Sequence, residues 1–193
     1  MKIGEAINTY RPQLNALWDK KVSLTKQQKE LQEKRAHSAD GGEQYAEEAA
    51  TIELTLNEVN ARYDETKAYF EKVMAAHTMA WNAEVSKQQG DAMKEYGEDM
   101  AKIMEIARRI SKGGIVPYKD EKKLMEYSME LYMSAKNLAV LAKEKDRQKY
   151  DSLWDDDKEK KQYDPQGAAD NTEINIEAPE VIDVDSIGTG GTE

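Results

Sequence analysis

Apolar side chains recur in the first part of the chain at alternating spacings of three and four, which places them on one face of an α-helix. The first such stripe consists of Tyr10, Leu14, Leu17, Lys21, Leu24, Gln28 and Leu31. Pro12 is compatible with the first turn of this helix, where its missing N–H breaks no hydrogen bond. The segment Ser38–Gly42 is expected to end the helix and reverse the chain.

A second stripe is longer, and its spacing alternates between four and three without a slip. It contains Tyr45, Ala49, Ile52, Leu56, Val59, Tyr63, Thr66, Phe70, Val73, His77 and Ala80. A helix from Glu43 to Gln89 would be about 70 Å long at the α-helical rise per residue. A helix of this length needs a long partner. The first helix can cover only part of it, so we expect a third helix of the chain, or another copy, to cover the rest.

The pattern is interrupted at Gly90 and resumes in a shifted phase. The later stripe is Met93, Tyr96, Met100, Ile103, Ala107 and Ile110. Two alternatives fit: the helix ends at Gly90, or one continuous helix rotates its apolar face there, since a single glycine costs a helix only about 1 kcal/mol. The next helix end is clearer, because Gly113 suits the left-handed conformation that follows a helix. Arg108 and Arg109 suit the negative end of the helix dipole.

A last helix is predicted to begin near Lys119 or Asp120 and to fade over Lys143–Tyr150. It has two adjacent apolar stripes, which form a wide face that belongs in a core or under a partner. The stripes are Leu124, Tyr127, Leu131, Ala135, Leu138 and Ala142, and beside them Met125, Met129, Tyr132, Met133 and Val140. The sequence therefore predicts an all-α fold, a long helical hairpin or coiled-coil-like helical bundle.

The negative charge is concentrated at the C-terminal end. The chain of 193 residues has a formal net charge of −10. Residues 1–150 carry 25 basic and 25 acidic side chains, whereas residues 151–193 carry 3 basic and 13 acidic ones. Such a segment buries too little apolar surface to offset its ordering entropy. We therefore expect a helical domain over 1–150 and an acidic disordered tail over 151–193.

One short pattern stands out within the tail. Val181, Ile182 and Val184 are interleaved with acidic residues, and further isoleucines lie on both sides. A peptide of this kind can add a strand to a sheet edge or fill a groove of a partner. The alternative is a tail that serves only to keep the protein in solution.

Candidate catalytic and metal-binding residues are scarce. The chain has no cysteine, which excludes disulfides, thiolate metal sites and a cysteine nucleophile. His77 has no second ligand at helical spacing and occupies a position of the second stripe, and His37 closes the first helix. The carboxylates alternate with lysines, as is typical of solvated helix faces. We therefore predict no enzymatic activity, no metal, no cofactor and no small-molecule substrate.

The apolar runs are only a few residues long, so we expect no membrane-spanning segment. The N-terminus lacks the apolar core of a secretory signal, which favours a cytoplasmic location. Residues 102–123 carry seven basic and three acidic side chains. This basic patch could contact phosphates, complement a helix dipole on a solvated loop, or dock the acidic tail. Nucleic-acid binding is disfavoured, because the tail would repel a polyanion.

The segment ARRISKGGIVPYKDEKKLMEYSMELYMSAKNLAVLAKEKD (107–146) combines a glycine-containing helix stop, a Val-Pro linker and a helix rich in Tyr and Met. On this basis residues 87–157 resemble uncharacterised bacterial helical proteins. The resemblance implies no activity, ligand or partner, and it favours a bacterial cytoplasmic origin.

The sequence predicts a non-enzymatic protein that acts through protein–protein interaction, as a scaffold or adaptor that self-associates. The alternative is an export or assembly chaperone of the flagellar or phage type, which holds a client on the helical face rich in Met and Tyr. An enzyme whose site no motif reveals, or a nucleic-acid-associated protein, are further alternatives. The candidate partner-binding residues are Leu56, Val59, Tyr63 and Phe70, then Met125, Met129, Tyr132 and Met133, and in the tail Val181, Ile182 and Val184.

Overall fold

The structure is a computed structural model, and it describes residues 1–37, 43–142, 147–155 and 161–188. Its elements are α1 (Ile3–Ala36), the 3₁₀ helix η1 (Glu43–Tyr45), α2 (Ala46–Ser111), α3 (Tyr118–Tyr127), α4 (Met129–Leu141), α5 (Pro165–Asn171) and the 3₁₀ helix η2 (Val184–Ser186). No β-strand occurs in these described ranges, where two isolated bridges pair Lys2 with Glu173 and Ile115 with Lys149. The predicted all-α fold is confirmed.

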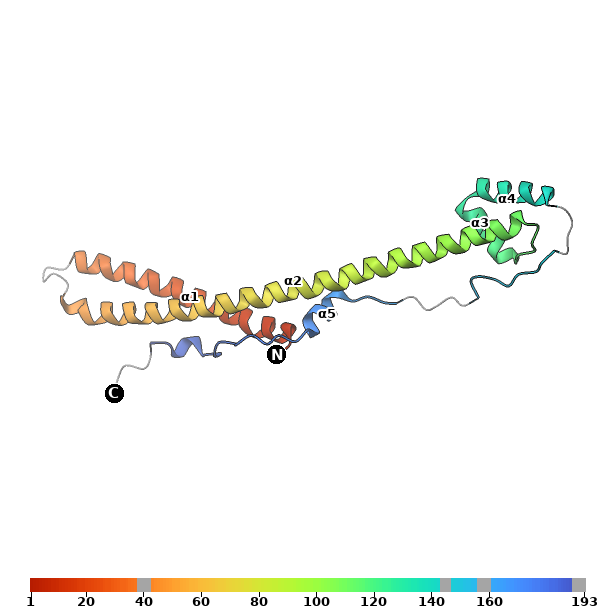
Figure 1. Cartoon of the computed structure of the whole chain (residues 1–193). Helices are drawn as coiled ribbons and strands as arrows, with labels where there is room; N and C mark the ends of the chain where they lie inside the picture. The colour runs from red at the N-terminus through yellow and green to blue at the C-terminus, as the bar shows by residue number, and fades with distance from the viewer. Residues whose placement is uncertain (38–42, 143–146, 156–160, 189–193) are drawn as a thin grey trace. The chain divides into compact units, whose positions relative to one another are not determined.

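Helices α1 and α2 pack against each other as a hairpin (Figure 1). Tyr10 of α1 packs on Tyr69 of α2 with 4.7 Å between ring centroids, and Trp18 packs on Tyr63 at 5.7 Å. The residue numbers rise along one helix as they fall along the other, so the two helices are antiparallel. Buried residues recur every seven positions, the repeat of coiled-coil packing. They are Ile3, Tyr10, Leu17, Leu24 and Leu31 in α1, and Ile52, Val59, Thr66 and Val73 in α2. The predicted hairpin is thus confirmed, while the turn predicted at Ser38–Gly42 lies outside the described residues.

Helix α2 continues through Gly90 without a break. Of the two alternatives, the continuous helix is therefore correct. A β-carbon at Gly90 would meet no atom within 4 Å, so this glycine is not required by a close contact. The predicted helix end is confirmed, because Gly113 adopts a φ of +80° and its N–H donates to the carbonyl of Ile110 at 2.8 Å.

The prediction of one continuous last helix is wrong, because two helices, α3 and α4, replace it. Ser128 separates them with an extended backbone, at φ −159° and ψ 108°. Its Oγ accepts a hydrogen bond from the Leu131 N–H at 3.1 Å. Serine is among the preferred N-cap residues, since its hydroxyl satisfies one of the unpaired N–H groups at a helix start. This hydrogen bond stabilises a new helix start inside an otherwise continuous apolar pattern.

The chain divides into two compact units. Unit 1 consists of Met1–Glu84 together with Asp164–Glu193, and unit 2 consists of Val85–Tyr163. The core of unit 1 lies between α1, the first part of α2 and the C-terminal residues. The core of unit 2 contains the buried residues Ile103, Ile106, Ala107, Ile110, Val116, Leu124, Ala135 and Trp154.

The described part of 151–193, where the sequence predicts a disordered tail, contains buried residues and a helix. Trp154, Ala169 and Ile187 are buried, and residues 165–171 form α5. The physical reason is the alternation of residue types, which the average composition of the segment conceals. Apolar side chains at intervals enter clusters formed by α1 and α2, while most of the acidic side chains between them remain in water.

Candidate interaction surfaces

The four candidate residues on α2 lie in or beside the core of unit 1. Val59 is fully buried, and Leu56, Tyr63 and Phe70 are partly buried against the same clusters. The cover that we expected from a third helix or a second copy is supplied here by α1 and by residues near the C-terminus. Val59 is therefore covered within unit 1, and the other three side chains are covered in part; their role in partner binding stays a prediction.

The C-terminal segment, defined here as Thr172–Gly188, is extended up to Asp183 and then forms the 3₁₀ helix η2 (Figure 1, blue). Its first residues pair with the N-terminus of the chain. The Ile3 N–H donates to the carbonyl of Thr172 at 3.0 Å, and the Ile174 N–H donates to the carbonyl of Met1 at 3.1 Å. Ile174 and Ile176 pack on a cluster that contains Tyr10, Tyr69 and Val73 among others.

Side chains of α1 recognise the backbone in the middle of the C-terminal segment. Tyr10 Oη donates to the carbonyl oxygen of Pro179 at 2.7 Å, and Gln13 Nε2 donates to that of Glu180 at 3.4 Å. Burial raises the pKa of Tyr10, so its hydroxyl keeps the proton that it donates. These hydrogen bonds are made to the main chain of the segment. They therefore do not depend on the side chains of Pro179 and Glu180.

The far part of the C-terminal segment packs between the helices. Ile182, Val184 and Ile187 contact a cluster formed by Leu17, Leu24 and Val59. The chain then passes so close to α2 that a β-carbon at Gly188 would lie 2.7 Å from Thr55 Oγ1. Gly188 also has a φ of +88°, a conformation that favours glycine. Of the three candidate residues in the tail, Ile182 and Val184 are thus partly buried, whereas Val181 is exposed.

Helix α5 holds the start of the C-terminal segment in place. Asp164 caps α5 by accepting a hydrogen bond from the Gly167 N–H, and Pro165 follows at its first position. Asp170 lies 3.3 Å from His77 Nε2 and accepts a hydrogen bond from Gln166 at 2.7 Å. His77 therefore has a structural partner on α5.

Helix α4 presents a neutral, apolar surface to solvent. Of its residues only Ala135 is buried. The side chains that form this surface are between 51% and 84% exposed, and we call them the α4 face: Met129, Met133, Leu138, Val140 and Leu141. Two of the candidate residues, Met129 and Met133, belong to it. The other two, Met125 and Tyr132, are partly buried.

Helix α4 has two charged residues, and its lysine already has an ion-pair partner. These two residues are Glu130 and Lys136. Lys136 Nζ lies 2.9 Å from the carboxylate of Glu121 on α3, and Tyr132 Oη donates to the same carboxylate at 3.2 Å. The α4 face itself therefore carries no charge.

Three lysines of the basic patch contact the start of the predicted tail. The ammonium groups of Lys102 and Lys123 lie 5.2 Å and 4.2 Å from the ring centroid of Trp154. Lys119 Nζ donates to the main-chain carbonyl of Trp154 at 3.1 Å, and the indole N–H donates to Asp99 at 3.3 Å. Of the three interpretations of this patch, the geometry favours a docking site for the chain's own acidic segment.

The two arginines of the basic patch form an ion-pair cluster with Glu105. Arg108 donates twice to its carboxylate, at 2.6 Å from both Nε and Nη2, and Arg109 Nε donates at 3.0 Å. The hydrogen bonds from Arg108, followed by those from Arg109, lower the pKa of Glu105 to about 2. Arg109 also stacks on Tyr150, with 4.4 Å between the guanidinium and the ring centroid.

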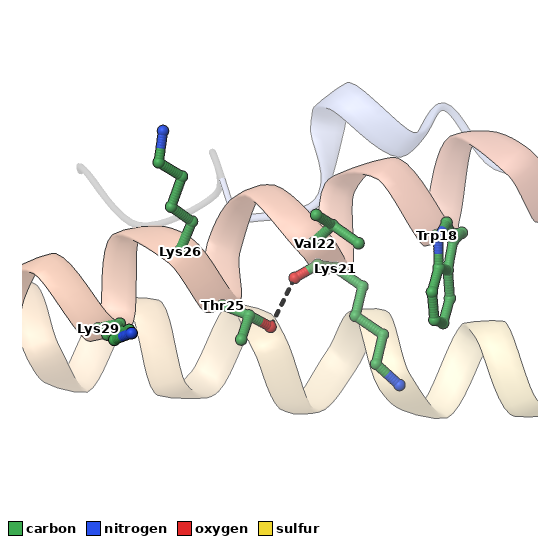
Figure 2. Close-up of a pocket in the computed structure, with 6 residues that line it drawn as sticks. All are labelled: Trp18, Lys21, Val22, Thr25, Lys26 and Lys29. Atoms are coloured by element: carbon green, nitrogen blue, oxygen red, sulfur yellow. Dashed lines mark hydrogen bonds between the residues drawn. The ribbon is translucent and has the colours of Figure 1, made fainter.

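A shallow pocket on α1, unforeseen from the sequence, combines an aromatic side chain with lysines. Figure 2 shows its lining residues, which are Trp18, Lys21, Val22, Thr25, Lys26 and Lys29. Lys21 Nζ lies 5.8 Å from the Trp18 ring centroid and 5.4 Å from that of Tyr63. The three lysines extend in different directions and do not converge on one point (Figure 2). We therefore assign no anion site to this pocket.

Within the described ranges, no group of three or more His, Asp or Glu side chains could hold a metal ion. No helix in the same ranges is both long enough and apolar enough to cross a membrane. The absence of enzymatic activity, metal and cofactor stays a prediction from the sequence.

The chain matches no protein-family model, no curated protein and no solved structure. The resemblance of residues 87–157 to uncharacterised bacterial helical proteins therefore stays a prediction, as does the bacterial origin that it favours.

Proposed function

We propose that this protein acts without catalysis, through protein–protein contacts, as a cytoplasmic helical scaffold or adaptor that self-associates. The observation that carries the proposal is the exposed α4 face. Large apolar side chains exposed together on one helix typically mark an interaction site, because leaving them in water is unfavourable. Val140 and Leu141 are among the most exposed large apolar side chains of the described residues.

The partner that best fits this surface is a second copy of the chain. Two copies related by a twofold axis would bring α4 against α4, so that each apolar face covers the other. Lys136 would add no unpaired charge to such a contact, since it is already paired with Glu121. A partner with a strongly charged surface would gain nothing from the neutral α4 face.

The test is the double substitution Met133→Asp and Val140→Asp. We expect the wild-type chain to be a dimer or larger species by light scattering after size exclusion, and the variant to be a monomer, because each carboxylate would have to be desolvated. Both residues are exposed, so circular dichroism should show an unchanged helix content. The control is Leu54→Asp, a residue that is 71% exposed on α2 in unit 1 and should leave assembly intact.

Substitution of Leu56 and Val59 would not be a useful test of assembly. Val59 is fully buried within unit 1, and a carboxylate there would unfold the hairpin. A wild-type chain that is monomeric at high concentration, or an oligomer that persists in the Met133→Asp, Val140→Asp variant, would contradict the proposal.

A second candidate function is an export or assembly chaperone of the flagellar or phage type. The exposed thioethers of Met129 and Met133 favour it, because methionine side chains adapt to differently shaped partner surfaces. A monomeric wild-type chain would agree with this function. Recovery of a client protein should then be lost in the Met129→Asp, Met133→Asp variant, and recovery that survives would exclude it.

A further inference from the structure

Unit 1 is built from two pieces of chain that are far apart in sequence. The groove is formed by α1 and the first part of α2, which belong to Met1–Glu84. Its occupant, the C-terminal segment Thr172–Gly188, returns only after the whole of unit 2. The covalent connection between groove and occupant is therefore long, and its last element, α5, helps to hold the start of the segment in place.

Those contacts are of a kind that any copy of the segment could make. Two side chains, Tyr10 and Gln13, bind main-chain carbonyl oxygens. Apolar side chains spaced along an extended backbone enter two clusters, with Ile174 near one end and Ile187 near the other. The recognition thus requires an extended peptide with apolar residues at these intervals, whichever molecule carries it.

The C-terminal segment is also suited to leave the groove. Its acidic side chains, such as Glu177 and Asp183, are exposed in the docked state and stay solvated on release. Between Ile174 and Asp183, its main chain is held by the two hydrogen bonds that carbonyl oxygens accept from the side chains of Tyr10 and Gln13. A peripheral segment held in this way opens locally at lower free energy than the helical core.

We propose that the groove between α1 and α2 is an exchangeable peptide site, which accepts the C-terminal segment of a second copy of this chain. The docked segment in the structure is then the intramolecular competitor of the incoming one. Both segments make the same contacts. Which of them occupies the groove therefore depends on the effective concentration of the tethered segment and on the concentration of chains. This proposal concerns unit 1 and does not rest on the α4 face.

Cysteine pairs offer a direct test, because the chain has no cysteine of its own. The β-carbon of Thr55 lies 3.3 Å from the β-carbon position at Gly188, somewhat shorter than the separation of about 3.8 Å in a disulfide. One copy carries Thr55→Cys and the other, with a tag that changes its mass, carries Gly188→Cys. A disulfide between these two positions then joins two different chains, and it forms when the segment of one occupies the groove of the other.

We expect the mixed disulfide to accumulate on oxidation at high chain concentration. It should exceed by at least tenfold the product from a matched pair of Leu54→Cys and Gly188→Cys copies, because Leu54 is adjacent to Thr55 but points to solvent. A chain that carries both Thr55→Cys and Gly188→Cys should form the disulfide within one molecule at low concentration. This double variant shows that the cysteine substitutions leave the docked geometry intact.

Two results would overturn the proposal. In one, the double variant closes its internal disulfide while the mixed copies give no more product than the Leu54→Cys pair. In the other, the double variant fails to close and a peptide of residues 172–188 also fails to bind the wild-type chain, which together would mean that the segment does not occupy the groove. The mixed disulfide should persist when both copies also carry Met133→Asp and Val140→Asp, so failure of the α4 contact can be distinguished from failure of exchange.

A β-carbon at Gly188 would lie 2.7 Å from Thr55 Oγ1, so a Gly188→Cys chain that keeps Thr55 disfavours docking of its own segment. A second measurement therefore uses the wild-type chain. A fluorescent peptide of residues 172–188 should gain anisotropy when the wild-type chain is added in excess. The same peptide with Ile182→Asp and Ile187→Asp should bind at least tenfold more weakly, and equal binding of the two peptides would count against the groove as the site.

Discussion

At the scale of single residues, Asp120 shows how one carboxylate can join separate parts of unit 2. It is completely buried in the first turn of α3, where the helix dipole favours a negative charge. Its two oxygens accept hydrogen bonds from Ser152 Oγ at 2.6 Å and from the Leu153 N–H at 3.0 Å. A buried charge is tolerated only with such partners. In the sequence Asp120 indicated no more than the start of a helix, because Ser152 and Leu153 lie 32 and 33 residues further along.

Glu105 leads to a prediction about pH. Its carboxylate has a pKa of about 2 in the folded chain, because Arg108 and Arg109 donate to its charged form. The unfolded value is 4.5, so the folded state binds the proton less tightly. The stabilising contribution of the cluster is therefore fully present above pH 4.5, and it is lost as the pH falls through the folded pKa near 2.

The comparison of wild type with Glu105→Gln tests this window. Urea unfolding followed at several pH values should show the wild type to be more stable at pH 6, and the difference should vanish toward pH 2. The control is Glu98→Gln, since Glu98 is exposed and pairs only loosely with Lys94 at 3.9 Å. A stability difference that is independent of pH would contradict the assignment.

At the scale of elements, α2 is a long continuous helix although it contains Gly90 and Gly97. The helix contains 66 residues and is about 100 Å long at the α-helical rise. A β-carbon added at Gly90 or at Gly97 would meet no atom within 4 Å, so no contact requires a glycine at either site. Both positions lie within regular helix, where glycine is less favourable than alanine because it loses more backbone entropy.

Gly90→Ala should therefore stabilise the protein by about 0.5–1 kcal/mol. The midpoint of chemical denaturation should rise, and the helical circular dichroism signal should stay the same or increase. Gly114→Ala provides the opposite control, because a β-carbon there would lie 2.6 Å from the ring of Tyr150. A loss of stability in Gly90→Ala would indicate that α2 is bent or broken at this residue.

The junction between α3 and α4 shows a local signal that outweighs a periodic one. The apolar pattern continues across residue 128, and on periodicity alone one helix is expected. The capping hydrogen bond from the Leu131 N–H to Ser128 Oγ supports a second start instead. After the break, α4 exposes an apolar surface that includes Met129 and Met133, two of the partner-binding residues expected from the sequence.

At the scale of the whole molecule, apolar residues between 164 and 188 are part of the core of unit 1. Ala169 is fully buried, Ile187 is nearly so, and the carbonyl groups of Pro179 and Glu180 satisfy side chains of α1. A tail that served only to keep the protein in solution would make none of these contacts.

Removal of residues 164–193 should therefore weaken unit 1 selectively. Hydrogen exchange of backbone amides should become faster in α1 and in residues 46–84, because apolar surface near Tyr10 and Val59 loses its cover. Amides of α3 and α4 in unit 2 should exchange as in the full chain. The single substitution Ile187→Asp should give a smaller change in the same direction, and unchanged exchange in unit 1 after the truncation would show that the segment contributes nothing to its core.

The sequence by itself determined the features that depend on neighbouring residues. The three-and-four spacing fixed which faces of α1 and α2 are apolar, and the heptad positions from Tyr10 to Leu31 are those that the structure buries. Gly113 marked a helix end because the left-handed conformation is a local property of glycine. These patterns act within a turn or two of helix, so they can be recognised without knowledge of the rest of the chain.

The tertiary structure decided the features that depend on residues far apart. Composition predicted a disordered tail, but Ile182 and Ile187 find a groove that exists only after α1 and α2 have paired. The α2 candidates such as Val59 were covered by that same pairing, whereas α4 was left exposed. Whether an apolar side chain is buried depends on which surfaces meet, and free energy of burial is gained only when they do, so no local pattern could decide between a core residue and a partner-binding one.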